Sequence, residues 1–249
     1  MNLKGKVALV TGASRGIGAG IARVLARHGA AVGVGYLNNA KEAHAVCEQI
    51  RSQGGSALGV RADVTQEGEI ASMISAVEKQ LGPINILVNN AGHNWIRPIL
   101  DISPDQWDAC LQLNLRACFM CAKAVLPGML ERKEGRIISI SSISGQRGGN
   151  SCDVDYSAAK AGILGFTRAL GKWAAPRGVL VNAVAPGYVL TDNLKTVGPD
   201  RIEATRKTIP LGRLGEPEEI GEVVAFLAGP GASYIVGETL TVNGGVHID

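Results

Sequence analysis

The chain has 249 residues, with 25 Lys and Arg against 22 Asp and Glu, so its formal net charge is +3. This length suits one large α/β domain or two small ones, and a composition of 46% hydrophobic and 19% charged residues excludes a disordered chain and a coiled coil. The small net charge, without basic clusters, gives no electrostatic reason to expect nucleic acid. No apolar run approaches the roughly eighteen residues of a membrane-spanning helix, and the first apolar run, at residues 7–10, is too short for a signal peptide. We therefore expect a cytoplasmic protein without a membrane partner.

The cysteines and histidines give no indication of a metal site. The five cysteines are an odd number, and only Cys118 and Cys121 have the C-x-x-C spacing of zinc and redox sites. Phe and Met stand between them, and no second ligand pair exists elsewhere. We expect buried core thiols and no bound metal.

Short apolar runs alternate with longer amphipathic stretches from one end of the chain to the other. Val7–Val10 is apolar throughout, as a strand covered on both faces would be, and the helical spacing that follows stops at Gly29. The pattern predicts strands at 7–10, 31–36, 57–61, 84–89, 136–141, 179–184 and 238–242, and helices at 17–28, 40–53, 67–81, 105–130, 155–174 and 217–228. This alternation predicts a single Rossmann-like domain over residues 1–249, a doubly wound parallel sheet of about seven strands with helices on both faces. Residues 187–213 lack periodicity and are expected to form a lid or binding loop.

A glycine-rich turn follows the first predicted strand and opens the first helix, at Thr11–Gly18. Glycines there allow a tight turn and a close approach of the backbone to a pyrophosphate, which the helix N-terminus attracts. Sites selective for NAD place a carboxylate about 20 residues further on, but residues 34–39 contain no acid. We therefore expect NADP(H) over NAD(H), with Arg15 paired to the 2′-phosphate. The alternative is that Arg15 is only a solvated loop residue.

Tyr156 and Lys160 stand four residues apart in a predicted helix and so share one face. A nearby ammonium favours the phenolate form, so we expect Lys160 to lower the pKa of Tyr156 towards neutrality. A tyrosine tuned in this way is suited to acid–base chemistry.

These residues bring the chain into close resemblance with the short-chain dehydrogenases/reductases, from the first strand to the last turn. The matching segments, in the family's order, are Thr11-Gly12-x-x-x-Gly16-x-Gly18, Asp63-Val64, Asn89–Gly92, Asn114, Ser142, Tyr156-x-x-x-Lys160, Pro186-Gly187 and Val242–Gly245. Within the family the chain is most similar to β-ketoacyl-acyl-carrier-protein reductases, in the runs Ile209–Gly215 and Gly237–Leu240. Similar endings also occur in sugar and polyol dehydrogenases, so these runs leave the substrate open.

The resemblance implies hydride transfer between nicotinamide and a carbonyl carbon. Tyr156 would donate the proton, Ser142 would hydrogen-bond the carbonyl oxygen, Lys160 would hold the ribose, and Asn114 would position a water that connects Lys160 to solvent. Asn114 could instead kink or cap a helix. Ser142 is chosen over its neighbouring serines because it matches the family's Ser-x-x-Gly pattern. The implied cofactor-binding residues are Gly12, Ser14, Arg15, Gly16, Ile17, Gly18, Tyr36, Asp63, Val64, Asn90, Ala91, Gly92, Tyr156, Lys160, Pro186, Gly187, Val189 and Thr191.

The substrate end is expected to involve two loops. The candidate residues are His93, Asn94, Trp95, Ser144, Gln146, Arg147, Asn150, Asp153 and Tyr188. Asp153 and Asp155 stand just before Tyr156; if Asp153 points inward it would disfavour anionic substrates, and otherwise either acid would be an ordinary helix N-cap. Asp63 could likewise cap the helix that follows it.

The favoured function is reduction of a 3-oxoacyl thioester carried on acyl-carrier protein. An acidic carrier would dock on basic residues that the resemblance places beside the cleft, Lys133 and Arg177. The alternative is a carbonyl, sugar or polyol dehydrogenase acting on a free small molecule, and a further alternative is a dinucleotide-binding regulator without catalysis. The resemblance also implies a homotetramer.

Overall fold

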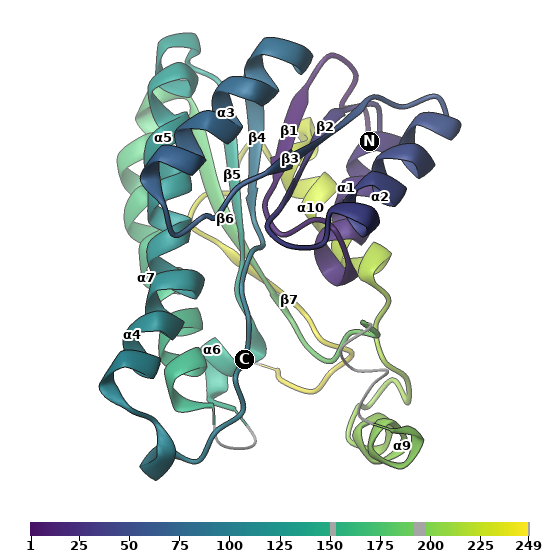
Figure 1. The fold of residues 1–249 in the computed structure, drawn as a ribbon, viewed down its shortest axis with the longest axis vertical. Helices are drawn as coiled ribbons and strands as arrows, with labels where there is room; N and C mark the ends of the chain where they lie inside the picture. The colour runs from purple at the N-terminus through teal and green to yellow at the C-terminus, as the bar shows by residue number, and fades with distance from the viewer. Residues whose placement is uncertain (150–152, 192–197, 249) are drawn as a thin grey trace.

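The computed structural model describes residues 1–149, 153–191 and 198–248. They build one parallel sheet of seven strands in the order β3-β2-β1-β4-β5-β6-β7 (Figure 1). The strands are β1 (Val7–Val10), β2 (Ala31–Tyr36), β3 (Ala57–Arg61), β4 (Ile84–Asn89), β5 (Gly135–Ile140), β6 (Val179–Pro186) and β7 (Thr239–Val242). The predicted doubly wound parallel sheet is confirmed, and each predicted strand lies within two residues of its place.

Helices cover both faces of the sheet because its central strands are apolar on both sides. All four residues of β1 are buried, with Ala8 and Val10 in one apolar core and Val7 and Leu9 in the other. The first core is closed by α1 (Gly16–Arg27), α2 (Ala40–Ser52) and α10 (Pro217–Ala228). The second is closed by α3 (Glu67–Leu81), α5 (Ala117–Arg132) and α7 (Val154–Ala174), the group on the left of Figure 1.

The chain reverses its winding direction between β1 and β4. From β1 it continues through α1 to β2 on one side, and from β4 it continues through α5 to β5 on the other. In open α/β sheets this reversal leaves a crevice at the carboxyl ends of the two strands, where ligands bind. The segments after β1 and β4 meet there, since the Thr11 hydroxyl accepts hydrogen bonds from the backbone N–H groups of Asn90 and Ala91, both at 3.0 Å.

Three helical segments differ from the predicted pattern. The stretch predicted as one helix at 105–130 is α4 (Pro104–Leu111), a π-helical segment η2 (Gln112–Arg116) and α5. The short helix α6 (Ile143–Arg147) was missed because five residues are too few to show periodicity. The helix α9 (Pro199–Lys207) lies in the stretch predicted as a loop; it buries no residue and so carries no apolar stripe. The remaining short turns are η1 (Ile99–Asp101), η3 (Ala175–Arg177) and η4 (Pro230–Ala232).

The helical stretch Pro104–Arg132 is long and apolar enough, by length and composition, to cross a membrane. Half of its most apolar window is buried within the protein, and core helices commonly meet the same criterion. The stretch therefore gives only weak support for a membrane span.

Four cysteines are free and buried, as predicted: Cys47, Cys110, Cys118 and Cys121. Burial raises the pKa of Cys110 and of Cys118 to about 11 and that of Cys121 to about 12, so these thiols stay protonated at neutral pH. The fifth, Cys152, lies outside the described residues. Within the described ranges, no group of three or more His, Cys, Asp or Glu side chains could hold a metal ion.

Candidate active site

The turn between β1 and α1 forms a cradle in which side chains would not fit. Gly12 has φ +63°, and a Cβ on it would lie 2.8 Å from the Ala91 Cα. A Cβ on Gly18 would lie 2.4 Å from the Gly12 carbonyl oxygen. The Asn90 amide closes the turn by donating to the carbonyls of Thr11 and Gly12, at 2.9 and 3.0 Å. The glycines are therefore required by close backbone contact, and they leave the N-terminus of α1 open to an anion.

One cavity of about 270 Å³ lies beyond this cradle, against β2 and β3. Its lining includes Gly12, Ser14, Arg15, Tyr36, Asp63, Val64, Asn90, Ala91, Gly92 and His93. The Asp63 carboxylate accepts hydrogen bonds from the Thr65 N–H at 2.9 Å and the Thr65 hydroxyl at 2.7 Å, in the turn before α3. These bonds close a turn ahead of the helix: α3 begins at Glu67, and its N-cap residue Gln66 has no side-chain capping bond, so Asp63 does not cap α3 and instead lines the cavity. No acid from residues 34–39 faces the space, and Tyr36, Leu37, Asn38 and Asn39 border it.

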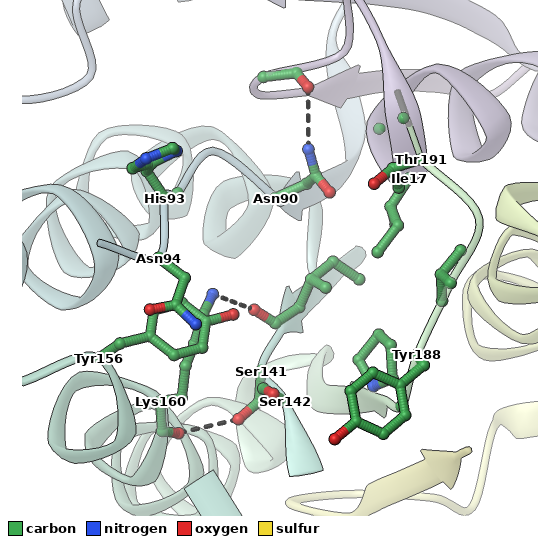
Figure 2. A pocket seen from close by; sticks show the side chains of 18 of the residues that line it. Ile17, Asn90, His93, Asn94, Ser141, Ser142, Tyr156, Lys160, Tyr188 and Thr191 are labelled. Carbon is green, nitrogen blue, oxygen red and sulfur yellow. Dashed lines mark hydrogen bonds between the residues drawn. The ribbon is translucent and has the colours of Figure 1, made fainter. Parts of the chain in front are cut away.

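A second cavity, of about 470 Å³, lies at the carboxyl ends of β4, β5 and β6. Its lining includes Gly12, Arg15, Gly16, Ile17, Gly18, Asn90, Gly92, His93, Asn94, Ser142, Tyr156, Lys160, Pro186, Gly187, Tyr188, Val189 and Thr191. Figure 2 shows Tyr156, Lys160 and Ser142 together on one side of this cavity. The two cavities share the glycine turn, so a dinucleotide could extend from one into the other.

Tyr156 meets its predicted neighbours, but its acidity differs from the prediction. Burial raises the pKa of the phenol to about 12, a hydrogen bond with Ser142 lowers it in part, and the negative charge of Asp153 raises it further. The Lys160 amine lies 5.4 Å from the centre of the Tyr156 ring and donates to the Ile140 carbonyl at 2.8 Å. The predicted lowering by Lys160 is therefore wrong for this structure, because burial of the phenol outweighs any effect of the ammonium. At neutral pH Tyr156 is a phenol and can donate a proton.

The neighbouring serines have separate partners. The Ser142 hydroxyl accepts from the Ser144 N–H at 3.0 Å and contacts Tyr156. The Ser141 hydroxyl donates to the Lys160 carbonyl at 2.8 Å, and Ser139 is engaged by Asn89 at 3.3 Å. Among these hydroxyls, the one bonded to the tyrosine is that of Ser142.

Asn114 lies in the π-helical segment and joins it to the loop after β4. Its amide donates to the carbonyls of His93 and Cys110 at 2.9 and 3.1 Å, and its oxygen accepts from the His93 N–H at 3.1 Å. A Cβ on Gly92 would lie 2.5 Å from that oxygen and 3.5 Å from the Lys160 amine. Asn114 is thus fully buried beside Lys160. It lies in a π-helical turn, a rare conformation that frequently occurs at functional sites.

The predicted substrate residues are only partly brought together. His93, Asn94 and Tyr188 line the larger cavity, and the pKa of His93 is lowered by burial and by the charges of Arg15 and Arg97. The Gln146 amide turns towards β7, where it donates to Thr241 at 2.9 Å. Trp95 packs edge-on against His93 with ring centres 4.7 Å apart.

Ser144 and Asp153 contact each other at 3.5 Å rather than lining the cavity directly. Asn150 lies outside the described residues. The cavity also has walls that the sequence analysis did not predict: Ile96, Ile140 and Ser141. Two of these residues could have been predicted from their place in the sequence, because Ile140 ends β5 at the edge of the sheet where the site lies and Ser141 follows it.

Lys133 and Arg177 do not lie beside the cleft of their own chain. Lys133 follows α5 and precedes β5, and Arg177 precedes β6, so both lie at the amino ends of these strands. The catalytic candidates lie at the carboxyl ends, across the length of the sheet. Arg177 stacks over Trp173 at 4.3 Å. The expectation of a basic docking site next to the cavity within one chain is therefore wrong.

Comparison with known proteins identifies the family. Residues 12–247 match the family described as enoyl-(acyl carrier protein) reductase. The chain is 44% identical over 248 residues to the 3-oxoacyl-[acyl-carrier-protein] reductase FabG of Vibrio cholerae, with both chains fully covered. The chain belongs to the short-chain dehydrogenases/reductases. Like other members of that family, it is an oxidoreductase acting on keto and CH–OH groups.

Two further relatives support this membership of the short-chain dehydrogenases/reductases. The FabG of Escherichia coli (strain K12) is 40% identical over 248 residues, with both chains fully covered. A solved variant of actinorhodin polyketide ketoreductase with NADPH has a TM-score of 0.92 and 37% identity, over 97% of both chains.

Proposed function

We propose that this protein is an NADP(H)-dependent reductase of 3-oxoacyl thioesters, with acyl-carrier protein as the carrier. The observation that carries the proposal is the placement of Tyr156, Ser142 and Lys160 around one cavity that continues into a glycine cradle. Full-length relatives that are 40–44% identical bear the name 3-oxoacyl-[acyl-carrier-protein] reductase, which supports the thioester as substrate. The same geometry would serve a carbonyl, sugar or polyol dehydrogenase, which is the alternative.

The residues present fit a dinucleotide phosphate. The cradle at Gly12 and Gly18 has no room for side chains, and Arg15 borders both cavities. The residues after β2 include no carboxylate that would repel a 2′-phosphate, and Arg15 supplies a cation for it. When bound, the nicotinamide would supply or accept the hydride. Support for NADPH also comes from the ketoreductase solved with it.

The chain's own residues would then handle the proton. Because burial keeps Tyr156 protonated at neutral pH, its hydroxyl is ready to donate to the oxygen of a reduced carbonyl. Ser142, already bonded to Tyr156, would donate to the same oxygen and stabilise its developing charge. Lys160 would hold the ribose hydroxyls, and Asn114 would link Lys160 to a water. The phenol form of Tyr156 is the form that carbonyl reduction requires.

The experiment that tests this proposal compares initial rates of NADPH and NADH oxidation with an acetoacetyl thioester and with a panel of simple ketones and diketones. Fast turnover of the thioester with NADPH is the expected result. Slow thioester turnover beside a good ketone, or activity only in the oxidative direction with sugars, would move the protein to the alternative. A preference for NADH would contradict the role given to Arg15.

We also propose that residues 1–249 act as one catalytic domain, in the cytoplasm, as a homotetramer. Exposed apolar side chains support assembly: Phe119 is 48% exposed and Trp173 47% exposed, on helices of the same face. In a tetramer the basic residues Lys133 and Arg177 could reach a cavity of another copy, which would restore their part in docking an acidic carrier. Light scattering at micromolar concentration measures the assembly directly, and a monomer would contradict this part of the proposal.

A further inference from the structure

Asp153 is a buried carboxylate without a cationic partner. It is 7% exposed, and no ion pair joins it to any described Lys, Arg or His. Among the described residues its oxygens accept from neutral donors: Ser157 at 3.3 Å, and Ser144 and Asn94 both at 3.5 Å. These bonds are long, so the charge is weakly compensated. A buried charge of this kind acts strongly on groups near it.

The Asp153 carboxylate occupies space that is open only because residue 149 is a glycine. A Cβ on Gly149 would lie 1.7 Å from the Asp153 Oδ1, so any other residue at position 149 would displace the acid. The Gly149 N–H also donates to Ser157, which in turn donates to Asp153. Asp153 occupies the N-cap position of α7, but its side chain makes no capping hydrogen bond. The interpretation of Asp153 as an ordinary helix cap is therefore wrong, and its carboxylate instead bonds Ser157, Ser144 and Asn94.

Asn94 connects Asp153 to the substrate end of the larger cavity. Asn94 lines the cavity, as Tyr156 does. Its amide nitrogen faces Asp153, while its buried Oδ1 has no hydrogen-bond partner among the described residues. After burial, the negative charge of Asp153 also contributes to the raised pKa of Tyr156. The Asp153 carboxylate therefore lies behind Asn94 at this end of the cavity, while the nearby cations Lys160, Arg15 and Arg97 lie at the Ile140 carbonyl, at the cofactor cradle and against Trp95.

We propose that Asp153 is a specificity-determining residue that, with Asn94, admits neutral 3-oxo esters and thioesters and turns away 3-oxo acids. A substrate carboxylate bound beside Asn94 would lie near the Asp153 carboxylate behind it, and the two like charges would repel each other. An ester or a thioester has no such charge. The inference rests on the proposed function, because it names the form in which the 3-oxo substrate is accepted.

The test compares kcat/KM for methyl acetoacetate with kcat/KM for acetoacetate, two compounds with the same reacting carbonyl, in the wild type and in Asp153→Asn. We expect the wild type to prefer the ester, and Asp153→Asn to reduce that preference by about tenfold or more, through a lower KM for acetoacetate. The matched control is Asp155→Asn. Asp155 is also fully buried, but it bonds the Tyr156 N–H at 2.8 Å and faces Cys110, so the preference should stay unchanged. An unchanged preference in Asp153→Asn, or an equal change in both variants, would overturn the proposal.

A second measurement needs no variant. The wild type is given an acetoacetate ester that carries a quaternary ammonium group, and its kcat/KM is compared with that of the uncharged ester. Anion exclusion by Asp153 predicts that the cationic ester is accepted at least as well as the neutral one, whereas equal rejection of both charges would overturn it. If no ester or thioester is turned over, the proposed function fails. The acid and ester are then compared as inhibitors of whichever ketone is reduced, and stronger inhibition by the ester would still support the role of Asp153.

Discussion

The two halves of the cleft are built from different parts of the chain. The nucleotide half is formed by residues 11–18, 36–39, 63–64 and 90–92. There the backbone shapes the site, because its glycines pack so close to neighbouring backbone atoms that a Cβ would collide with them. In the substrate half, which includes His93, Asn94, Ser142, Tyr156 and Tyr188, side chains shape the site, and several side chains in and around it take their direction from a distant partner. Gln146, for example, bonds Thr241, 95 positions away. Backbone shape is encoded by glycine spacing, whereas side-chain direction is not visible until the chain is folded.

The largest effect is expected where the two halves meet, at Tyr156. Tyr156→Phe removes the proton donor and should lower kcat by about 10²–10⁴-fold, the usual contribution of general acid catalysis. The nucleotide half is untouched by this change, so the NADPH dissociation constant, measured by fluorescence titration, should stay within about twofold of the wild type. Turnover close to that of the wild type would remove Tyr156 from the mechanism.

A second change tests whether backbone contact defines the nucleotide half. In Gly18→Ala the new methyl group would meet the Gly12 carbonyl, so we expect a loss of about 1–3 kcal/mol in the free energy of unfolding and weaker NADPH binding. The control is Gly68→Ala in α3, where nothing lies within 4 Å of the new atom. That variant should be as stable as the wild type or more stable by less than about 1 kcal/mol. Denaturant titration measures both, and equal effects would show that the cradle is not closely packed.

A third change tests whether the Arg15 side chain sets the preference for NADPH over NADH. Arg15→Ala should weaken NADPH binding by about tenfold, as loss of a charge-assisted bond to a phosphate implies. NADH lacks the 2′-phosphate, so its dissociation constant should change much less. Parallel titrations with both cofactors give the ratio. An equal loss for both would place Arg15 at the pyrophosphate instead.

The smallest signal is the titration of Tyr156 in the cofactor-free protein. Its pKa is raised to about 12, so the proton is lost only as pH rises towards that value, and Tyr156 should remain a phenol through pH 9. The difference in tyrosinate absorbance between the wild type and Tyr156→Phe, followed from pH 7 upwards, should therefore appear only in strongly alkaline solution. A tyrosinate signal near pH 7–8 would restore the original expectation that Lys160 lowers this pKa.

Predictions from the sequence succeeded where a pattern has one physical meaning. The strands were found because runs buried on both faces are apolar throughout, and the phosphate cradle was found because glycines stand between a strand and a helix. The prediction failed for α9, which has no buried face, and for the π segment, whose distortion accompanies the bonds of Asn114 to His93 and Cys110. Gln146 and Asp153 could not be oriented because their partners come from other elements: Thr241 from β7, and Asn94 from the loop after β4.

The sequence by itself determined the parallel sheet, the glycine cradle at its switch point and the Tyr156–Lys160 pair on one helical face, since each follows from local spacing and chain order. Only the tertiary structure decided the protonation of Tyr156 and the surroundings of Asp153. Both depend on burial, and burial is set by whichever segments pack around a group: the loop carrying Asn94, the helix carrying Cys110 and the turn at Gly149. The pKa and the direction of a side chain are thus properties of its surroundings, and those surroundings come from residues far apart in the chain.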